Sequence, residues 1–175
     1  MRLLSSRTRF VPCAPEQVFA CIDRIGGRTG WYFANFLWRL RGWLDLLVGG
    51  VGLRRGRDDP EHLRLGDAVD CWRVETLEAG RMVRLRAEMT APGRGWLQFE
   101  VTPAPGGALL HQTALFEAQG VGGLLYWFGL GPVHHLLFSG MIRRIARAAT
   151  RAAATTAATA PPGTAQPAGR AVVDP

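Results

Sequence analysis

The middle of the chain alternates apolar and polar residues with a period of two, which is typical of half-buried β-strands. Residues 67–116 contain four such segments, separated by turn signals at Ala79-Gly80, Pro92-Gly93 and Pro105-Gly106-Gly107. Because short turns join consecutive strands, the strands must pair antiparallel. The pattern predicts a meander with one apolar face, formed in two of its strands by Val83, Leu85, Ala87, Met89, Leu97, Phe99 and Val101.

Other elements flank this meander on both sides. A strand over Ser5–Val11 precedes a short helix that starts near Pro15, and a second helix is predicted over 31–48. The second helix carries an apolar stripe that we expect to be buried, consisting of Phe33, Leu37, Leu40, Leu44 and Leu47. A last helix begins near Val121 and should kink at Pro132. Strands joined by short turns, with helices set apart from them, indicate an α+β fold.

The composition changes after Arg151. Residues 152–175 are mostly Ala, Thr, Pro and Gly, which bury too little apolar surface to offset the entropy of ordering. We therefore predict one domain over 1–151 and a disordered tail over 152–175. With 175 residues, 47% of them apolar and 20% charged, a single globular domain is the expected class.

Charge and cysteine content exclude several functions. The chain has 21 arginines, no lysine and 14 acidic residues, which gives a net charge of +7. No nucleic-acid-binding motif accompanies this excess of positive charge. Cys13, Cys21 and Cys71 form no CxxC pair, so neither disulfides nor a zinc site are expected. Because the N-terminus also lacks the apolar run of a signal peptide, we expect a cytoplasmic protein.

Two strongly apolar stretches raise the question of a membrane span. The stretch 31–53 is interrupted by Arg39, Arg41 and Asp45, and the stretch 121–138 by a proline and two histidines. We therefore predict no transmembrane segment.

The opening FVPCAPEQVF (10–19) resembles the first strand and helix of the START, polyketide-cyclase and birch-pollen-allergen (SRPBCC) superfamily. The segments GWYFANFLWRLRGWLDLLVGGVGLRRGR (30–57), LRLGDAVDCWRVE (63–75) and LRAEMTAPGRGWLQFEV (85–101) resemble a bacterial domain family of unknown function within it. The resemblance spans about 10–149. It implies a helix-grip (START-like) fold, in which a curved antiparallel sheet wraps around a long C-terminal helix, with two short helices after the first strand and a pocket in between.

In the family that this chain resembles, the domain often follows a short-chain-dehydrogenase-like domain that binds NAD(P). No GxGxxG opens a helix here, so a redox role would need a separate NAD(P)-binding oxidoreductase as partner. We expect no cofactor and no metal in this chain itself.

Polar residues on the inner sheet face are the candidates for chemistry. In the strand 68–76, the set containing Asp70 and Trp72 is predicted to face inward, because the other set would bury Arg73 with Glu75. In the strand 109–117, Leu110, Gln112, Ala114 and Phe116 are the better inward set, which leaves His111 and Thr113 outside. The last helix adds the aromatic side chains of Tyr126 and Trp127 and the imidazole of His134. The predicted ligand-binding residues are Asp70, Trp72, Leu85, Phe99, Gln112, Tyr126, Trp127 and His134.

Each candidate also has a structural interpretation. Asp70, whose ionisation we expect to be perturbed, equally suits a role as an acceptor of backbone or arginine hydrogen bonds. His134 suits a cap at the broken helix better than a metal ligand, because no ligand lies at the i and i+4 spacing. The loop 53–60 can either grip an anion with its arginines or be neutralised by its own aspartates.

Three functions remain open at this point. The leading hypothesis is the binding of a small hydrophobic molecule in the pocket. The first alternative is an enzyme of cyclase, dehydratase or isomerase type that uses Asp70 and His134 as proton carriers. The second is an accessory module for a separate dinucleotide-dependent oxidoreductase.

Overall fold

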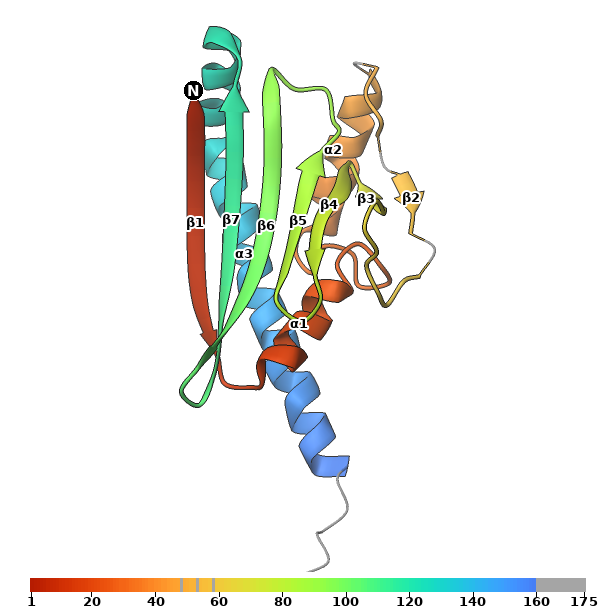
Figure 1. Ribbon diagram of the computed structural model, residues 1–175. Helices are drawn as coiled ribbons and strands as arrows, with labels where there is room; N and C mark the ends of the chain where they lie inside the picture. Colours follow the sequence, from red (N-terminus) through yellow and green to blue (C-terminus); the bar gives the residue numbers. More distant parts are fainter. Residues whose placement is uncertain (48, 53, 58, 160–175) are drawn as a thin grey trace, which may run out of the picture.

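The computed structural model describes residues 1–47, 49–52, 54–57 and 59–159, with backbone alone for 54–56. Within these residues the strands form one seven-stranded sheet in the order β1-β7-β6-β5-β4-β3-β2, and all neighbours pair antiparallel. A long helix, α3, runs diagonally along one face of the curved sheet (Figure 1). This is the helix-grip arrangement of an α+β protein, which confirms the predicted fold class.

The helices and strands have the following bounds. The strands are β1 (Arg2–Val11), β2 (Arg54–Gly56), β3 (Ala68–Asp70), β4 (Trp72–Glu78), β5 (Met82–Ala87), β6 (Gly93–Ala104) and β7 (Gly107–Ala118). The helices are α1 (Pro15–Asp23), α2 (Asn35–Leu47) and α3 (Gly120–Thr159).

The predicted alternation of the meander is confirmed. Along β7 every second residue is buried, and Leu110, Gln112, Ala114 and Phe116 face the core. His111 lies on the outer face, where its ring bonds Thr8 Oγ1 and Thr102 Oγ1 at 2.9 and 3.1 Å. The first strand, β1, pairs with the last strand, β7, so the two ends of the strand sequence lie side by side in the sheet.

The single strand expected over 68–76 is two strands. Val69 pairs with Trp72, so Asp70 and Cys71 form a two-residue turn between β3 and β4. Asp70 has φ +58°, a left-handed conformation that aspartate tolerates better than most residues. As a result Val69 and Cys71 are buried along with Asp70, Trp72 and Val74, and simple alternation fails at this point.

Helix α2 differs from its prediction in both its start and its buried face. It begins at Asn35 and not at Trp31, because left-handed backbone at Tyr32 and Ala34 prevents helix before it. Its buried residues are Trp38, Gly42 and Asp45. The stripe that was expected to be buried is largely exposed, with Leu40 at 54%, Leu44 at 55% and Leu47 at 73%.

Helix α3 is continuous through Pro132 and extends to Thr159. The boundary predicted at 151 therefore falls inside the helix, because the alanines that follow Arg151 have the highest helix propensity of any residue. The remainder of the predicted tail, 160–175, lies outside the described residues. The predicted inward residues of this helix, from Phe138 through Met141 and Ile145 to Ala149, are buried.

The three cysteines are free and buried. None of the helices in the described part of the chain has the length and apolar character needed to cross a bilayer.

Candidate functional site

A cavity of about 490 Å³ lies between the sheet, α2 and the first half of α3. Its walls are almost entirely apolar or aromatic. Helix α2 contributes Leu37, Leu40 and Leu44, and α3 contributes Leu130 and Val133. The volume falls within the range of small-molecule sites, roughly 300–1,000 Å³.

Two aromatic clusters contribute side chains to the cavity walls, the first through Trp38 and Trp72 and the second through Phe116 and Trp127. On the α2 side Trp31 stacks on Trp38, with ring centroids 4.5 Å apart, and Trp72 lies 6.3 Å from Trp31. On the α3 side Phe116 stacks on Trp127 at 5.7 Å. The second cluster continues along the helix through His134, whose ring lies 5.8 Å from Trp127 and 5.5 Å from Phe138. Such rings supply large apolar contact areas with few rotatable bonds.

The charged groups of the site gather around Arg41, which lines the cavity from α2. Its Nη2 donates to Asp70 Oδ1 at 3.0 Å and to the Gly52 carbonyl at 3.3 Å. Asp45, one helical turn further, lies 4.0 Å from Nη1. One arginine therefore joins α2 to the turn between β3 and β4.

Asp45 serves mainly to hold the backbone. Its Oδ2 accepts the N–H of Gly52 at 2.9 Å, and its Oδ1 accepts the N–H of Thr90 at 3.1 Å. These bonds fix the end of α2 to the segment after β5. Since both oxygens bind backbone N–H groups, Asp45 holds the backbone around the cavity.

Asp70 is the most perturbed carboxyl of the site. Burial raises its pKa to about 6, although the charge of Arg41 acts in the opposite direction. Its Oδ2 has no hydrogen-bond partner among the described residues. A buried carboxyl on left-handed backbone, beside a cavity and with a pKa near neutrality, is the combination that functional sites often show.

Several other polar atoms here are buried without partners in the described part of the structure. They are Trp38 Nε1, Trp72 Nε1, Arg41 Nε and His134 Nδ1. Burial, with the charge of Arg7, lowers the pKa of His134, so its imidazole is neutral at pH 7. Burial also raises the pKa of Tyr126, which stays a phenol.

The structure brings together only part of the predicted site. Trp72, Tyr126, Trp127 and His134 line the cavity. Asp70 does not line it and reaches it through Arg41. Among the described residues, no hydrogen bond or ion pair joins Asp70 to His134, the proposed acid and base.

The other three predicted residues are part of the packed core. Leu85, Phe99 and Gln112 are at most 1% exposed and do not line the cavity. They share the inner sheet face with the site, but the helices cover them. The amide of Gln112 has no partner at either Nε2 or Oε1 in the described structure.

Sequence reasoning missed Arg41 and Asp45 as site residues and used them only as charges that interrupt the apolar stretch 31–53. Their spacing of four residues places them on one helical face, close to Trp38. A charged pair on the same face as a buried tryptophan was the available signal.

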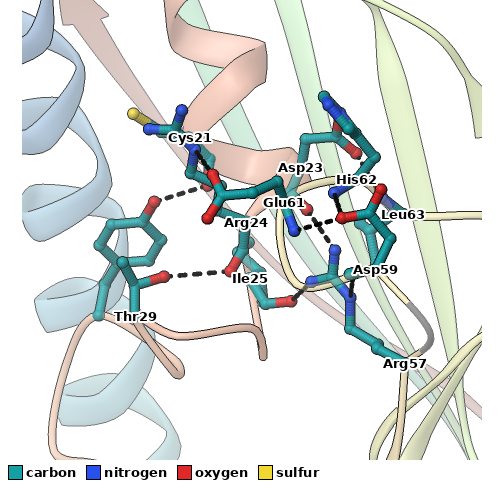
Figure 2. A network of polar contacts seen from close by, with 11 residues as sticks. Cys21, Asp23, Arg24, Ile25, Thr29, Arg57, Asp59, Glu61, His62 and Leu63 are labelled. Carbon is teal, nitrogen blue, oxygen red and sulfur yellow. Dashed lines mark hydrogen bonds and ion pairs between the residues drawn. The ribbon is translucent and has the colours of Figure 1, made fainter.

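The loop after β2 is tied to the end of α1 (Figure 2). Arg57 donates to the carbonyl oxygens of Asp23, at 2.8 Å, and Ile25. Asp23 in turn accepts from Leu63 N at 2.7 Å and contacts His62 Nδ1 at 2.9 Å. The guanidinium of Arg57 is therefore held by backbone carbonyls, which favours a structural role for this arginine. The side chains of Arg54 and Arg55 lie outside the described residues. Leu53 and Asp58 lie outside the described residues.

Within the described chain, no three His, Cys, Asp or Glu side chains are grouped so that they could hold a metal ion.

Solved structures with the same architecture include two aromatase/cyclases and Ara h 8.0201. The Zhui aromatase/cyclase from Streptomyces sp. R1128 is similar with a TM-score of 0.52 and 13% identity, over 86% of this chain and 95% of that one. Ara h 8.0201 is similar with a TM-score of 0.51 and 9% identity, over 86% and 99%. The di-domain aromatase/cyclase StfQ of the steffimycin biosynthetic pathway has a TM-score of 0.50 and 13% identity, over 91% of this chain and 53% of its own. At these identities the likeness concerns the fold alone.

No curated protein matches the chain in sequence. One family model matches residues 2–141, which is most of the domain. The chain therefore belongs to the family described as "Protein of unknown function (DUF2867)".

Proposed function

We propose that the protein binds a small, mainly hydrophobic molecule in the cavity between α2, α3 and the sheet. The observation that carries the proposal is a cavity of about 490 Å³ with walls of leucine and aromatic side chains. Burying apolar ligand surface in such walls yields roughly 25 cal/mol per Å² before the costs of association. At about −0.3 kcal/mol per ligand atom, a drug-sized ligand binds with a dissociation constant on the order of micromolar.

The position of Arg41 suggests a polar group on this ligand. Arg41, Asp45 and Asp70 make one side of the site polar, whereas the two aromatic walls are apolar. Buried polar atoms without partners cost about 1–3 kcal/mol each. A hydroxyl or carbonyl group that hydrogen-bonded near Arg41 would recover part of this cost, so we propose an amphiphilic ligand with a single polar end.

A calorimetric titration tests the proposal. The probes are dodecanoic acid and 1-anilinonaphthalene-8-sulfonate, and the variant is Leu130→Trp, which fills the cavity from α3. Leu125→Trp is the matched control, because Leu125 lies on the same helix but is 70% exposed and does not line the cavity. We expect Leu130→Trp to weaken binding by about tenfold or more and the control to leave it unchanged. Equal affinities for both variants would contradict the proposal.

One observation favours an enzyme instead. The carboxyl of Asp70 has a pKa of about 6, which suits general acid and base catalysis near neutral pH. Two aromatase/cyclases share the fold. A protein-dependent exchange of the α-protons of 2-tetralone in D₂O, lost in Asp70→Asn, would support this alternative. If Asp70→Asn left the exchange rate unchanged, the catalytic role would be refuted.

The accessory role beside a separate NAD(P)-binding oxidoreductase stays a prediction, as does the cytoplasmic location. The disorder expected after Arg151 stays a prediction only for 160–175, which lie outside the described residues.

A further inference from the structure

Helices α2 and α3 expose an unusual amount of apolar surface. Of the fifteen large apolar side chains that are exposed in the described chain, eleven lie on these two helices. On α2 they are Phe36, Leu40, Trp43, Leu44, Leu46 and Leu47. On α3 they are Val121, Leu125, Phe128, Val133 and Leu136. We call these eleven residues the apolar helical face; contiguous patches of this kind usually mark an interaction site.

Part of the apolar helical face borders the cavity. Leu40 and Leu44 of α2 are more than half exposed and also line the cavity. Val133 of α3, which is 42% exposed, lines the cavity as well. A surface that covers this face would therefore also cover the route to the cavity.

The charges around the face have one sign. The only acid in α2 is Asp45, which is buried, and α3 contains no acid at all over its length. Arg39 is exposed within the α2 stripe. The α3 stripe, with residues such as Leu136 at spacings of three and four, continues into the exposed Arg143 and Arg147.

The outer face of the sheet is different. There basic and acidic side chains pair, as in Arg73 with Glu88 at 2.6 Å and Arg86 with Glu75 at 3.8 Å. Apolar residues with arginines and no exposed acid are thus a property of α2 and α3, whereas α1 carries the exposed Glu16.

We propose that the apolar helical face docks on an anionic lipid bilayer. Aromatic and leucine side chains enter the boundary between headgroups and acyl chains, while arginines attract anionic headgroups. Phe36, Trp43 and Phe128 supply the aromatic side chains. A protein partner or a second copy of this chain would be expected to meet pairs of both signs, as on the outer sheet face, whereas a bilayer of anionic lipid needs only one. The docking proposal rests on the exposed residues of α2 and α3 and does not depend on whether the cavity binds a ligand.

Vesicle co-sedimentation of the full chain tests the proposal. The vesicles contain phosphatidylcholine alone, which has no net charge, or phosphatidylcholine with about 30% phosphatidylglycerol, which makes the surface anionic. We expect binding to the anionic vesicles, with a blue shift of tryptophan emission because Trp43 is 69% exposed in the free protein. The double variant Trp43→Ser/Leu47→Ser should bind about tenfold or more weakly.

Two controls separate the contributions. Leu4→Ser/Leu65→Ser removes apolar side chains that are 64% and 69% exposed elsewhere, and should leave binding unchanged. Arg143→Gln/Arg147→Gln should weaken binding by roughly thirtyfold, whereas Arg84→Gln/Arg94→Gln, with the same change in charge on the sheet, should have a much smaller effect. Unchanged circular dichroism confirms that each variant is folded.

Three results would overturn the proposal. The first is absence of binding to the anionic vesicles, and the second is equal loss of binding in the face and control variants. The third is a dimer in analytical ultracentrifugation that Trp43→Ser/Leu47→Ser makes monomeric, because the face would then be an interface between copies. A failed ligand titration with retained vesicle binding would refute the cavity proposal alone.

Discussion

The carboxyl of Asp70 should make the stability of this protein depend on pH. In the folded state it is 9% exposed, and burial raises its pKa from 3.8 to about 6. In the unfolded chain it has its ordinary pKa. A carboxyl whose pKa is higher in the folded state stabilises the fold when protonated, and this contribution is lost as the pH rises from about 4 to above 6.

The size of this effect follows from the two pKa values. Each tenfold change in proton affinity is worth about 1.4 kcal/mol, so the change from 3.8 to about 6 corresponds to about 3 kcal/mol. Little solvent screening applies, because Asp70 is nearly buried. The total free energy of unfolding of a domain is about 5–15 kcal/mol, so the effect is large enough to measure.

Urea denaturation of the wild type and of Asp70→Asn at pH values from 4 to 7.5 provides the assay. Asparagine has no charge at any of these pH values and removes the anion that pairs with Arg41 Nη2, as protonation of Asp70 does, while Asp45 stays 4.0 Å from Nη1 in both cases. We expect the stability of Asp70→Asn relative to the wild type to increase by about 2.5 kcal/mol between pH 4 and pH 7, because at pH 4 the carboxyl of the unfolded chain is already more than half ionised. Taking the difference of the two curves cancels other groups, such as His134, whose lowered pKa makes stability rise with pH.

A difference between wild type and Asp70→Asn that stays constant with pH would refute the reasoning. Arg41→Met is the second variant, because Arg41 holds the pKa of Asp70 lower than burial alone would. In that variant the loss of stability with rising pH should extend to higher pH.

Three further predictions concern residues around the site. Gln112→Leu should stabilise the fold by about 1–2 kcal/mol in urea denaturation, because its buried amide has no partner in the described structure; a loss of stability would show that the amide is satisfied. Arg57→Met should cost about 1–2 kcal/mol and speed hydrogen exchange at the Leu63 amide, since Arg57 holds the carbonyls of Asp23 and Ile25; unchanged exchange would contradict the role of this loop. His134 should titrate below its usual 6.5 by NMR and move upward in Arg7→Met, because the charge of Arg7 lowers its pKa; an identical titration in both proteins would exclude that coupling.

The sheet was predictable because burial on one face leaves a direct trace in the sequence. The alternation in β7 placed Leu110, Gln112 and Phe116 inward and His111 outward, as observed. The turn at Asp70 was not predictable in the same way. Both possible faces of that segment carry apolar residues, and the left-handed backbone that breaks the alternation leaves no periodic signal.

The site was only partly predictable, because the sequence shows which face of an element is apolar but not what covers it. Leu85 and Phe99 lie on the predicted face, yet they are at most 1% exposed and do not line the cavity. In α2 the apolar stripe with Leu40 and Leu44 indicated burial, but the structure leaves it exposed at the opening of the cavity. Arg41, which joins α2 to Asp70, depends on a contact between residues 29 positions apart.

Intermolecular nuclear Overhauser effects between the protein and bound dodecanoic acid test the central claim most directly. If the cavity is the binding site, the acyl chain will show contacts to Leu130, Trp127 and Trp72, which line it from helix and sheet. Contacts restricted to Leu125, Phe128 and Trp43, which are exposed and do not line the cavity, would contradict it.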